Sequence, residues 1–227
     1  MSKELKKRIL TSILLILVVL FCIFTNRQIY IAFIFLISFI IFLEINRLIF
    51  LIKKKAKKVK IFPLRAITFF FIFFIFLPAT INLYKFGEIY ITYILLVCAL
   101  SDIGGYVVGK NIGGKKLTKI SPNKTISGSF GSLIFSIIPF LILNNTDKII
   151  FSNFYENFFL CLKISIICQL GDLLISYIKR KAKVKDTGKI LPGHGGLLDR
   201  IDGIIFAMPF VWFHQSGINN FFDIFLS

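Results

Sequence analysis

Residues 29–52 read IYIAFIFLISFIIFLEINRLIFLI, and this stretch decides the class of fold. It is long enough to cross the hydrocarbon core of a bilayer, which takes about 20 apolar residues in a helix. Further apolar runs occupy residues 9–25, 66–84, 89–101, 126–143, 158–178 and 201–213. The pattern predicts an all-α, polytopic transmembrane protein with about seven spans, and six to nine spans fit the same runs.

The amino-acid composition argues against a soluble globular protein. Hydrophobic residues make up 56% of the chain, and 28 of its 227 residues are Phe. A soluble domain is about 45–50% apolar and needs polar side chains to cover its surface. Lipid is the solvent that accepts such a surface, so the membrane lipid bilayer is the first partner that the sequence predicts.

The net charge of +17 is spread over short segments between the apolar runs. If the N-terminus is inside and seven spans alternate, the inside segments are 1–8, 53–60, 102–125 and 179–200. These segments hold 22 Lys and Arg residues, whereas the outside segments hold three. The positive-inside rule then predicts an inner membrane of bacterial type, with the N-terminus and the polar loops cytoplasmic. Nucleic acid is not expected as a partner, because the basic segments are short and tethered to the bilayer.

The chain divides into two regions on this reading. Residues 1–90 are expected to form N-terminal transmembrane helices, and residues 91–227 a C-terminal catalytic transmembrane region. The second region contains two segments rich in Gly, Lys and Asp, which we call the first polar loop (residues 101–125) and the second polar loop (residues 179–203). The charge pattern places both loops on the same side of the membrane.

The first polar loop combines glycines, lysines and hydroxyl side chains. Asp102 ends an apolar run, where a charge needs a partner. Glycines let the backbone approach a ligand and present its N–H groups, and lysines neutralise negative charge. A phosphate-rich ligand requires such groups, although the P-loop spacing is absent, and a plain turn between spans is the alternative. The candidate substrate-binding residues are Asp102, Gly104, Lys115, Ser121, Pro122, Lys124 and Thr125.

The second polar loop brings carboxylates close to many cations. If a helix starts at Leu197, Asp199 and Asp202 share one of its faces. Asp172 lies in an apolar run about two turns before Lys179, so it should face the protein interior. Hard oxygen ligands suit Mg²⁺, which usually bridges to substrate phosphates. We therefore expect Asp172, Asp199 and Asp202 to hold Mg²⁺, with Asp–Arg pairing at a helix end as the alternative.

His194 is the one histidine that lies in a polar loop. Gly193 precedes it and Gly195 and Gly196 follow it, so its neighbours in sequence offer no side chain for the imidazole to pack against. A histidine in such a place can donate to a phosphate or act as a general acid–base group.

The stretch from Ser176 to Asp202 resembles the C-terminal signature of the phosphatidate cytidylyltransferase family, also called CDP-diacylglycerol synthase. The matching positions are Ser176, Lys179, Arg180, Lys185, Asp186, Gly188, Leu191, Pro192, His194, Gly195, Gly196, Asp199, Arg200 and Asp202. The first polar loop is similar to the family's Asp-x-Gly-x-Tyr … Gly-Lys … Ser-Pro-x-Lys-Thr region. This chain continues with Ile126-Ser127-Gly128, where the family usually has Trp-Glu-Gly. Glu44 and Arg47 resemble a polar pair in an early helix of the family.

The resemblance implies that CTP and phosphatidate react to give CDP-diacylglycerol and pyrophosphate. It implies Mg²⁺ as cofactor and leaves open a monovalent cation and a homodimer. The implied catalytic residues are Asp172, Lys179, Arg180, Lys185, Asp186, His194, Asp199, Arg200 and Asp202, and Ser176, Gly195 and Gly196 would join the substrate-binding residues. Acyl chains would enter from the bilayer.

Two other functions fit the same residues. One is an enzyme with another acceptor, either a CTP-dependent lipid kinase or a cytidylyltransferase for a different lipid phosphate. The other is a transporter of anions or phosphorylated lipids, which would suit an intramembrane Asp172 and basic loops. Against transport, the chain has no detectable inverted repeat, and its polar groups gather on one side of the membrane.

Overall fold

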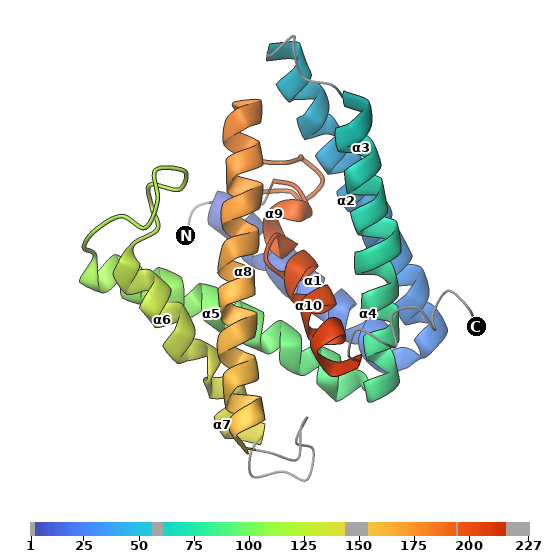
Figure 1. The fold of residues 1–227 in the computed structure, drawn as a ribbon, viewed down its shortest axis with the longest axis vertical. Coiled ribbons are helices and arrows are strands. Elements are labelled where there is room, and N and C mark those ends of the chain that lie inside the picture. Colours follow the sequence, from blue (N-terminus) through green and yellow to red (C-terminus); the bar gives the residue numbers. More distant parts are fainter. Residues whose placement is uncertain (1–2, 56–60, 144–153, 194, 217–227) are drawn as a thin grey trace. The chain divides into compact units, whose positions relative to one another are not determined.

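The computed structural model describes residues 3–55, 61–143, 154–193 and 195–216 (Figure 1). These residues are mainly helical. The elements are α1 (Lys3–Thr25), α2 (Arg27–Lys55), α3 (Ile61–Phe70), η1 (Phe71–Phe76), α4 (Leu77–Leu83), η2 (Tyr84–Phe86), α5 (Glu88–Ile112), α6 (Ile126–Ser136), α7 (Ile138–Leu143), α8 (Phe154–Ala182), α9 (Leu198–Ile201) and α10 (Ile204–Ser216). Within the described part of the chain, β pairing is limited to two isolated bridges, which agrees with the predicted all-α class.

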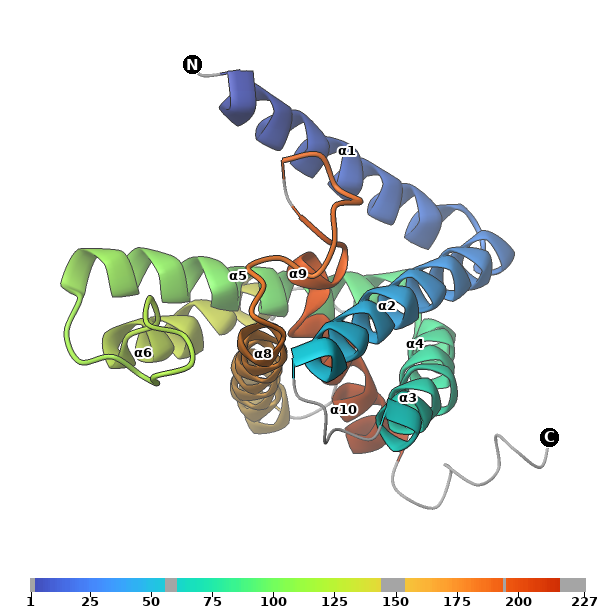
Figure 2. The ribbon, with the colours of Figure 1, turned by 90° about the horizontal axis from the view of Figure 1, so that it is seen from above.

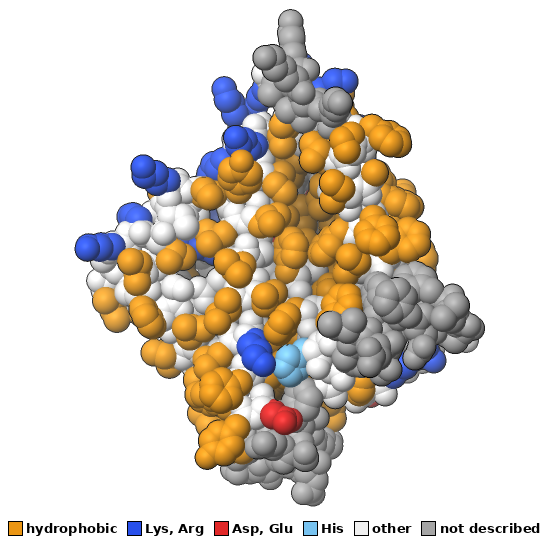
Figure 3. Space-filling view, viewed as in Figure 1, with side chains coloured by type: hydrophobic (Ala, Val, Ile, Leu, Met, Phe, Trp, Pro, Cys, Tyr) orange, Lys and Arg blue, Asp and Glu red, His pale blue; other side chains and the backbone are white. Residues whose placement is uncertain are grey.

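Six helical stretches in the described residues are long and apolar enough to cross a bilayer. They are Arg8–Thr25, Arg27–Lys55, Ile61–Phe86, Glu88–Ile112, Ile126–Leu143 and Phe154–Ala182. The last of the seven apolar runs forms α10, which is shorter. Hydrophobic side chains cover much of the face drawn in Figure 3, as a lipid environment requires. The predicted polytopic helical membrane protein is therefore confirmed.

The helices form two compact units. The first unit comprises Met1–Glu88 and Ile178–Asp202, and the second comprises Ile89–Tyr177 and Gly203–Ser227. The single helix α8 contributes to both, because its residues up to Tyr177 belong to the second unit and its last turn to the first. The first unit is thus built from two segments far apart in sequence.

In the first unit, α2 packs against α1 and against the rod formed by α3, η1 and α4 (Figure 2). Tyr30 of α2 donates a hydrogen bond of 3.0 Å to the Thr80 carbonyl oxygen and stacks on Tyr84 with ring centroids 4.7 Å apart. Phe42, three turns further along α2, meets Phe69 edge to face. These contacts fix the helix that carries Glu44 and Arg47.

In the second unit, α5 and α6 pack backbone against backbone through small residues. A Cβ atom added to Gly131 would lie 2.7 Å from the Gly104 carbonyl oxygen, and one added to Gly128 would lie 2.7 Å from that of Gly105. Only glycine permits so close an approach, as in helix pairs of other membrane proteins. The expectation of a loop from residue 101 was therefore wrong for residues 101–112, which form the last turns of α5. The glycines of this stretch form the surface of α5 against which α6 packs.

Two further contacts of the second unit join α8 to α5 and to the residue before α10. The hydroxyl oxygens of Ser101 and Ser165 are 2.7 Å apart, and both side chains are buried. Gly203, just before α10, lies against the backbone of Cys168, where an added Cβ would come within 2.9 Å of the carbonyl oxygen. Hydroxyl pairs and close backbone contacts of this kind join helices in lipid, where apolar contacts drive association only weakly.

Candidate functional site

Residues 179–182, expected in the second polar loop, instead form the last turn of α8, so the expectation of a loop from residue 179 was wrong, and the loop leaves α8 at Lys183. The Val184 N–H donates to the Lys179 carbonyl oxygen (3.1 Å), and the Lys183 N–H donates to that of Arg180 (3.0 Å), with Lys183 at φ = 54°. This is a Schellman motif with lysine in the left-handed position that glycine usually occupies. The Lys55 ammonium of α2 donates to the Ala182 carbonyl oxygen at 2.7 Å, which satisfies another group at the helix end. The chain leaves α8 in a fixed direction.

The middle of this loop is a tight turn that lies against α1 (Figure 2). The backbones of Leu191 and Gly195 exchange hydrogen bonds of 2.9 and 3.1 Å, and Gly193 and Gly195 both have positive φ. A Cβ on Gly193 would lie 3.2 Å from the Arg8 side chain, and the Thr11 hydroxyl lies 3.5 Å from the Pro192 carbonyl oxygen. The N-terminal helix therefore supports the tip of the loop.

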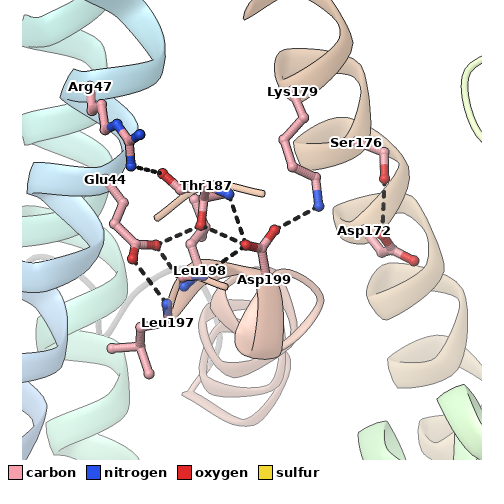
Figure 4. Close-up of polar contacts among 10 residues, drawn as sticks. Glu44, Arg47, Asp172, Ser176, Lys179, Thr187, Leu197, Leu198 and Asp199 are labelled. Atoms are coloured by element: carbon pink, nitrogen blue, oxygen red, sulfur yellow. Dashed lines mark hydrogen bonds and ion pairs between the residues drawn. The ribbon is translucent and has the colours of Figure 1, made fainter. Parts of the chain in front are cut away.

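Asp199 is the central carboxylate of the first unit (Figure 4). Its Oδ1 accepts a hydrogen bond of 2.8 Å from the Lys179 ammonium, and the two side chains are only 6% and 15% exposed. Its Oδ2 accepts from the backbone N–H groups of Thr187 (2.8 Å) and Gly196 (3.0 Å). The loop thus holds one oxygen of the carboxylate and leaves the other directed at a cation.

These contacts determine the charge on Asp199. Burial raises the pKa of Asp199, but the hydrogen bonds from Lys179 and from the Thr187 and Gly196 N–H groups lower it by more. The pKa of the carboxyl therefore lies below its ordinary value of 3.8. Asp199 is an anion at neutral pH, as a ligand for a cation must be.

Glu44, deeply buried in α2, is a second carboxylate in contact with the same loop. Its Oε2 accepts hydrogen bonds from the Thr187 hydroxyl (2.7 Å) and the Leu198 N–H (2.9 Å), and its Oε1 accepts from the Leu197 N–H (3.0 Å). Arg47 donates to the Thr187 carbonyl oxygen at 3.4 Å (Figure 4). The sequence-based site included neither Glu44 nor Thr187. A carboxylate inside an apolar run was the signal that could have identified Glu44.

A polar cluster in the second unit surrounds Asp172 of α8. Asp172 forms an ion pair with Lys124, and its Oδ1 accepts a hydrogen bond of 3.2 Å from the Ser176 hydroxyl. Asp102 of α5 lies within electrostatic range of both Asp172 and Lys124. Lys124 and Asp172 are about one-quarter exposed. Asp172 of α8 therefore pairs with Lys124, and the charge of the exposed Asp102 of α5 acts on both.

The first polar loop itself is a compact turn that ends at α6. The Leu117 N–H donates to the Lys124 carbonyl oxygen at 2.9 Å, and the Lys124 N–H donates to that of Ser121 at 3.1 Å. Thr125 is the N-cap of α6, because its buried hydroxyl accepts from the Gly128 N–H at 3.1 Å. This folding brings Lys124 to the start of α6, where it reaches α8.

The other residues expected at the site are spread over both units. Arg180, Lys185, Asp186 and Arg200 are exposed in the first unit, where Gly195 lies beside Asp186 and Asp199, and Asp202 follows α9 with helical backbone angles. In the second unit, Lys115 and Pro122 are exposed, Ser121 is half-buried and Gly104 lies in the α5–α6 contact. His194 is outside the described residues.

The carboxylates bear on the expected metal. Among the residues that the structure describes, no three His, Cys, Asp or Glu side chains come together as a metal site. The helix expected at Leu197 is present, since α9 runs from Leu198 to Ile201 and residues 197–202 have helical backbone angles. A divalent ion would therefore need substrate phosphates or water to complete its shell, which is the usual arrangement for Mg²⁺.

Comparison with known proteins adds a family match. Residues 48–216 match the model of the Cytidylyltransferase family. The phosphatidate cytidylyltransferase of Bacillus subtilis (strain 168) is 42% identical over 133 residues, which are 58% of this chain and 49% of that protein. The proteins of the same name from Staphylococcus haemolyticus (strain JCSC1435) and Staphylococcus aureus (strain COL) are 46% and 44% identical over 128 residues, which are 54% of this chain and 47% of each relative. The chain thus spans about half the length of these relatives.

Proposed function

Since this chain belongs to the cytidylyltransferase family, we propose that it transfers the cytidylyl group of CTP to phosphatidate in phospholipid biosynthesis, giving CDP-diacylglycerol and pyrophosphate. The family membership expected from residues 176–202 is confirmed by the match. One observation carries the proposal: the second polar loop holds Asp199 against Lys179 beside the end of an apolar helix. A carboxylate and a lysine at the end of a membrane helix suit a reaction in which a nucleotide meets a lipid headgroup at the membrane surface.

The reaction demands charge neutralisation and alignment. A phosphate oxygen of phosphatidate attacks the α-phosphorus of CTP, a new P–O bond forms, and the bond to the β-phosphate breaks to release pyrophosphate. The lipid phosphate is already ionised, so no general base is required. The cations available are Lys179, Arg180, Lys185 and Arg200, at the end of α8 and along the loop. We propose that they bind the triphosphate and the lipid phosphate, because catalysis of phosphoryl transfer is mostly positioning and electrostatic stabilisation.

We propose Mg²⁺ as the cofactor, with carboxylates as its protein ligands. Asp199 in the first unit and Asp172 in the second each direct an oxygen at a lysine ammonium, so each already faces a positive charge. Hard carboxylate oxygens are the ligands that Mg²⁺ prefers. When bound, Mg²⁺ would neutralise phosphate oxygens during the transfer. Asp202, which directly follows α9, is a further ligand in this proposal.

The remaining polar residues would bind the substrates. We propose that Lys124, which pairs with Asp172, and the nearby Ser176 bind substrate. Asp102, whose charge acts on both Asp172 and Lys124, is included in the same proposal. Phosphatidate would enter from the bilayer, with its headgroup at the level of the polar loops. The same proposal places the N-terminus and both polar loops on the cytoplasmic side of the cell inner membrane, which the distribution of Lys and Arg supports.

The test uses two labels on one nucleotide. Membranes from cells that express this chain receive phosphatidate and CTP labelled on either the α- or the γ-phosphate. A cytidylyltransferase places the α label in lipid and the γ label in pyrophosphate, whereas a CTP-dependent lipid kinase places the γ label in lipid. The Asp199→Asn variant should give no more labelled lipid than control membranes. Glu88→Gln, a carboxylate change away from the polar loops, should match wild type. If neither label reaches lipid above the level of control membranes, the proposed function is wrong.

A further inference from the structure

Glu44 is a buried carboxylate to which the proposed reaction assigns no role. It lies in the middle of a membrane-spanning helix and is only 4% exposed. A carboxylate in such a place is costly unless its oxygens are satisfied. The donors that satisfy it all come from the second polar loop, 143 to 154 residues further along the chain. A helix of the first region thus binds the segment that carries Asp199.

The hydrogen bonds of Glu44 are divided between its two oxygens. Oε1 accepts from the Leu197 N–H, and Oε2 accepts from the Leu198 N–H and the Thr187 hydroxyl. The Leu197 and Leu198 N–H groups lie at the start of α9, so no preceding turn of that helix can accept them. Each donor points at an oxygen that carries negative charge, which makes these bonds stronger than bonds between neutral groups.

The loop is shaped to the Glu44 carboxylate. A Cβ on Gly196 would come within 2.6 Å of both oxygens of Glu44, and it would collide with the Thr187 hydroxyl. A Cβ on Gly188 would collide with Oε1 of Glu44. The glycines at these two positions therefore leave the space that the glutamate fills, and a side chain at either would displace the loop.

Thr187 links Glu44 to Asp199. Its hydroxyl oxygen lies 2.7 Å from Oε2 of Glu44 and 3.1 Å from Oδ2 of Asp199. Its backbone N–H and that of Gly196 hold the same Oδ2 of Asp199. By fixing Thr187 and Leu197, Glu44 fixes the two N–H groups that set the direction of Asp199 toward Lys179.

We propose that Glu44 is a positioning residue for the cytidylyltransferase reaction: it anchors residues 187–198 to α2 so that Asp199 and Lys179 keep their relative geometry. The reaction part of this proposal rests on the proposed function, whereas the anchoring part rests on the contacts alone. Glu44 touches neither substrate in this account and acts through the loop. Displacement of a reacting group by about 1 Å can cost about 100-fold in rate.

The experiment compares Glu44→Gln with wild type in detergent, using two readouts. Glutamine keeps the shape but replaces one oxygen with an NH₂ group, which must face a backbone N–H at either position. We expect trypsin to cut at Lys183, Lys185 and Lys189 about 10-fold faster in the variant, because a loss of about 1.4 kcal/mol of anchoring makes opening of the loop tenfold more frequent. Cleavage at Lys115 and Lys119 in the first polar loop should keep its wild-type rate and is the internal reference.

The second readout is kinetic. We expect kcat to fall by about 100-fold in Glu44→Gln, with a much smaller change in the KM for CTP, because the lysines that bind phosphate remain. Two control variants test whether the effect is specific to Glu44. Ser38→Ala removes another buried polar group of α2, and Glu88→Gln removes a carboxylate charge near Tyr84, by the C-terminal end of α1. Both should keep wild-type kcat and wild-type trypsin cleavage.

A second pair of variants keeps the proposal testable if Glu44→Gln does not fold. Thr187→Val preserves the shape but removes the hydroxyl that donates to Glu44, so it should show the same faster cleavage and lower kcat. Thr187→Ser restores the hydroxyl and should return both toward wild type, which a loss of general stability would not explain. The proposal is overturned if the Val and Ser variants behave alike, or if Glu44→Gln folds and is cleaved at the wild-type rate. Absence of activity in the wild type would overturn the proposed function alone, since trypsin still reports whether Glu44 anchors the loop.

Discussion

Replacing Lys179 with methionine tests how strongly the candidate site depends on its ion pair. The Lys179 ammonium and the Asp199 carboxylate are 2.8 Å apart, and both side chains are largely buried. Removing one partner of a fully buried pair costs about 3–5 kcal/mol, whereas exposed pairs contribute about 0.2–1 kcal/mol. Asp199 retains its bonds from Thr187 and Gly196 in the variant, which offset part of the loss. We therefore expect a loss of about 2 kcal/mol in the free energy of unfolding.

Thermal unfolding of the purified protein in detergent measures this loss. For a chain of this length, about 2 kcal/mol corresponds to a fall in Tm of about 4–8 °C. Lys54→Met is the matched control, because Lys54 is an exposed lysine in the last turn of α2, and its Tm should change by less than about 1 °C. An unchanged Tm in Lys179→Met would show that the pair contributes nothing measurable, and the reasoning from burial would be refuted.

The remaining predictions concern the carboxylates, the metal and the helix contact. Because the folded state lowers the pKa of Asp199 below 3.8, the stability it contributes is complete above that value and is lost as the pH falls through the folded-state pKa. The Tm difference between wild type and Asp199→Asn should therefore shrink below about pH 4. Asp172→Asn should lower transfer of the α label to lipid at least about 100-fold with normal insertion, and near-normal activity would remove Asp172 from the metal proposal. Chelation with EDTA should stop the reaction and added Mg²⁺ should restore it; activity that persists in EDTA would contradict the cofactor. Gly131→Val should destabilise by about 1–3 kcal/mol, because its side chain would meet Val108, while Phe130→Val on the exposed side should keep its Tm.

The fold class was predictable from the sequence because each membrane span is a long, continuous apolar run. Runs of about 20 apolar residues identify helices almost independently of tertiary structure, since lipid requires every backbone polar group to be paired within the helix. The end of α5 was harder to predict. Gly104, Gly105 and Gly109 are typical of a loop in an aqueous protein, but in this membrane protein they form a small-residue surface for α6. Which of these uses applies depends on a partner helix that local sequence does not reveal.

The candidate site was predictable only in part. Lys179 and Asp199 were both expected from the signature, and the structure pairs them. The contact of Glu44 with Thr187 was not predictable from spacing, because the two residues are 143 positions apart and Thr187 occupies a variable position in the pattern. Long-range hydrogen bonds of this kind arise from the packing of the first unit, and a single sequence contains no periodicity that records them.

The division of the first unit between two distant segments has a consequence for biosynthesis. The helix that carries Glu44 is translated before its hydrogen-bond donors, which follow 143 to 154 residues later. At about 5–20 residues per second, the glutamate spends roughly 7–30 s without them. During this interval it must rely on water, a proton or an insertion factor, so the nascent chain passes through a stage at which quality-control proteases could recognise an unfinished membrane protein. The unit that is begun first on the ribosome is therefore completed late, after nearly all of the second unit's membrane helices have been made.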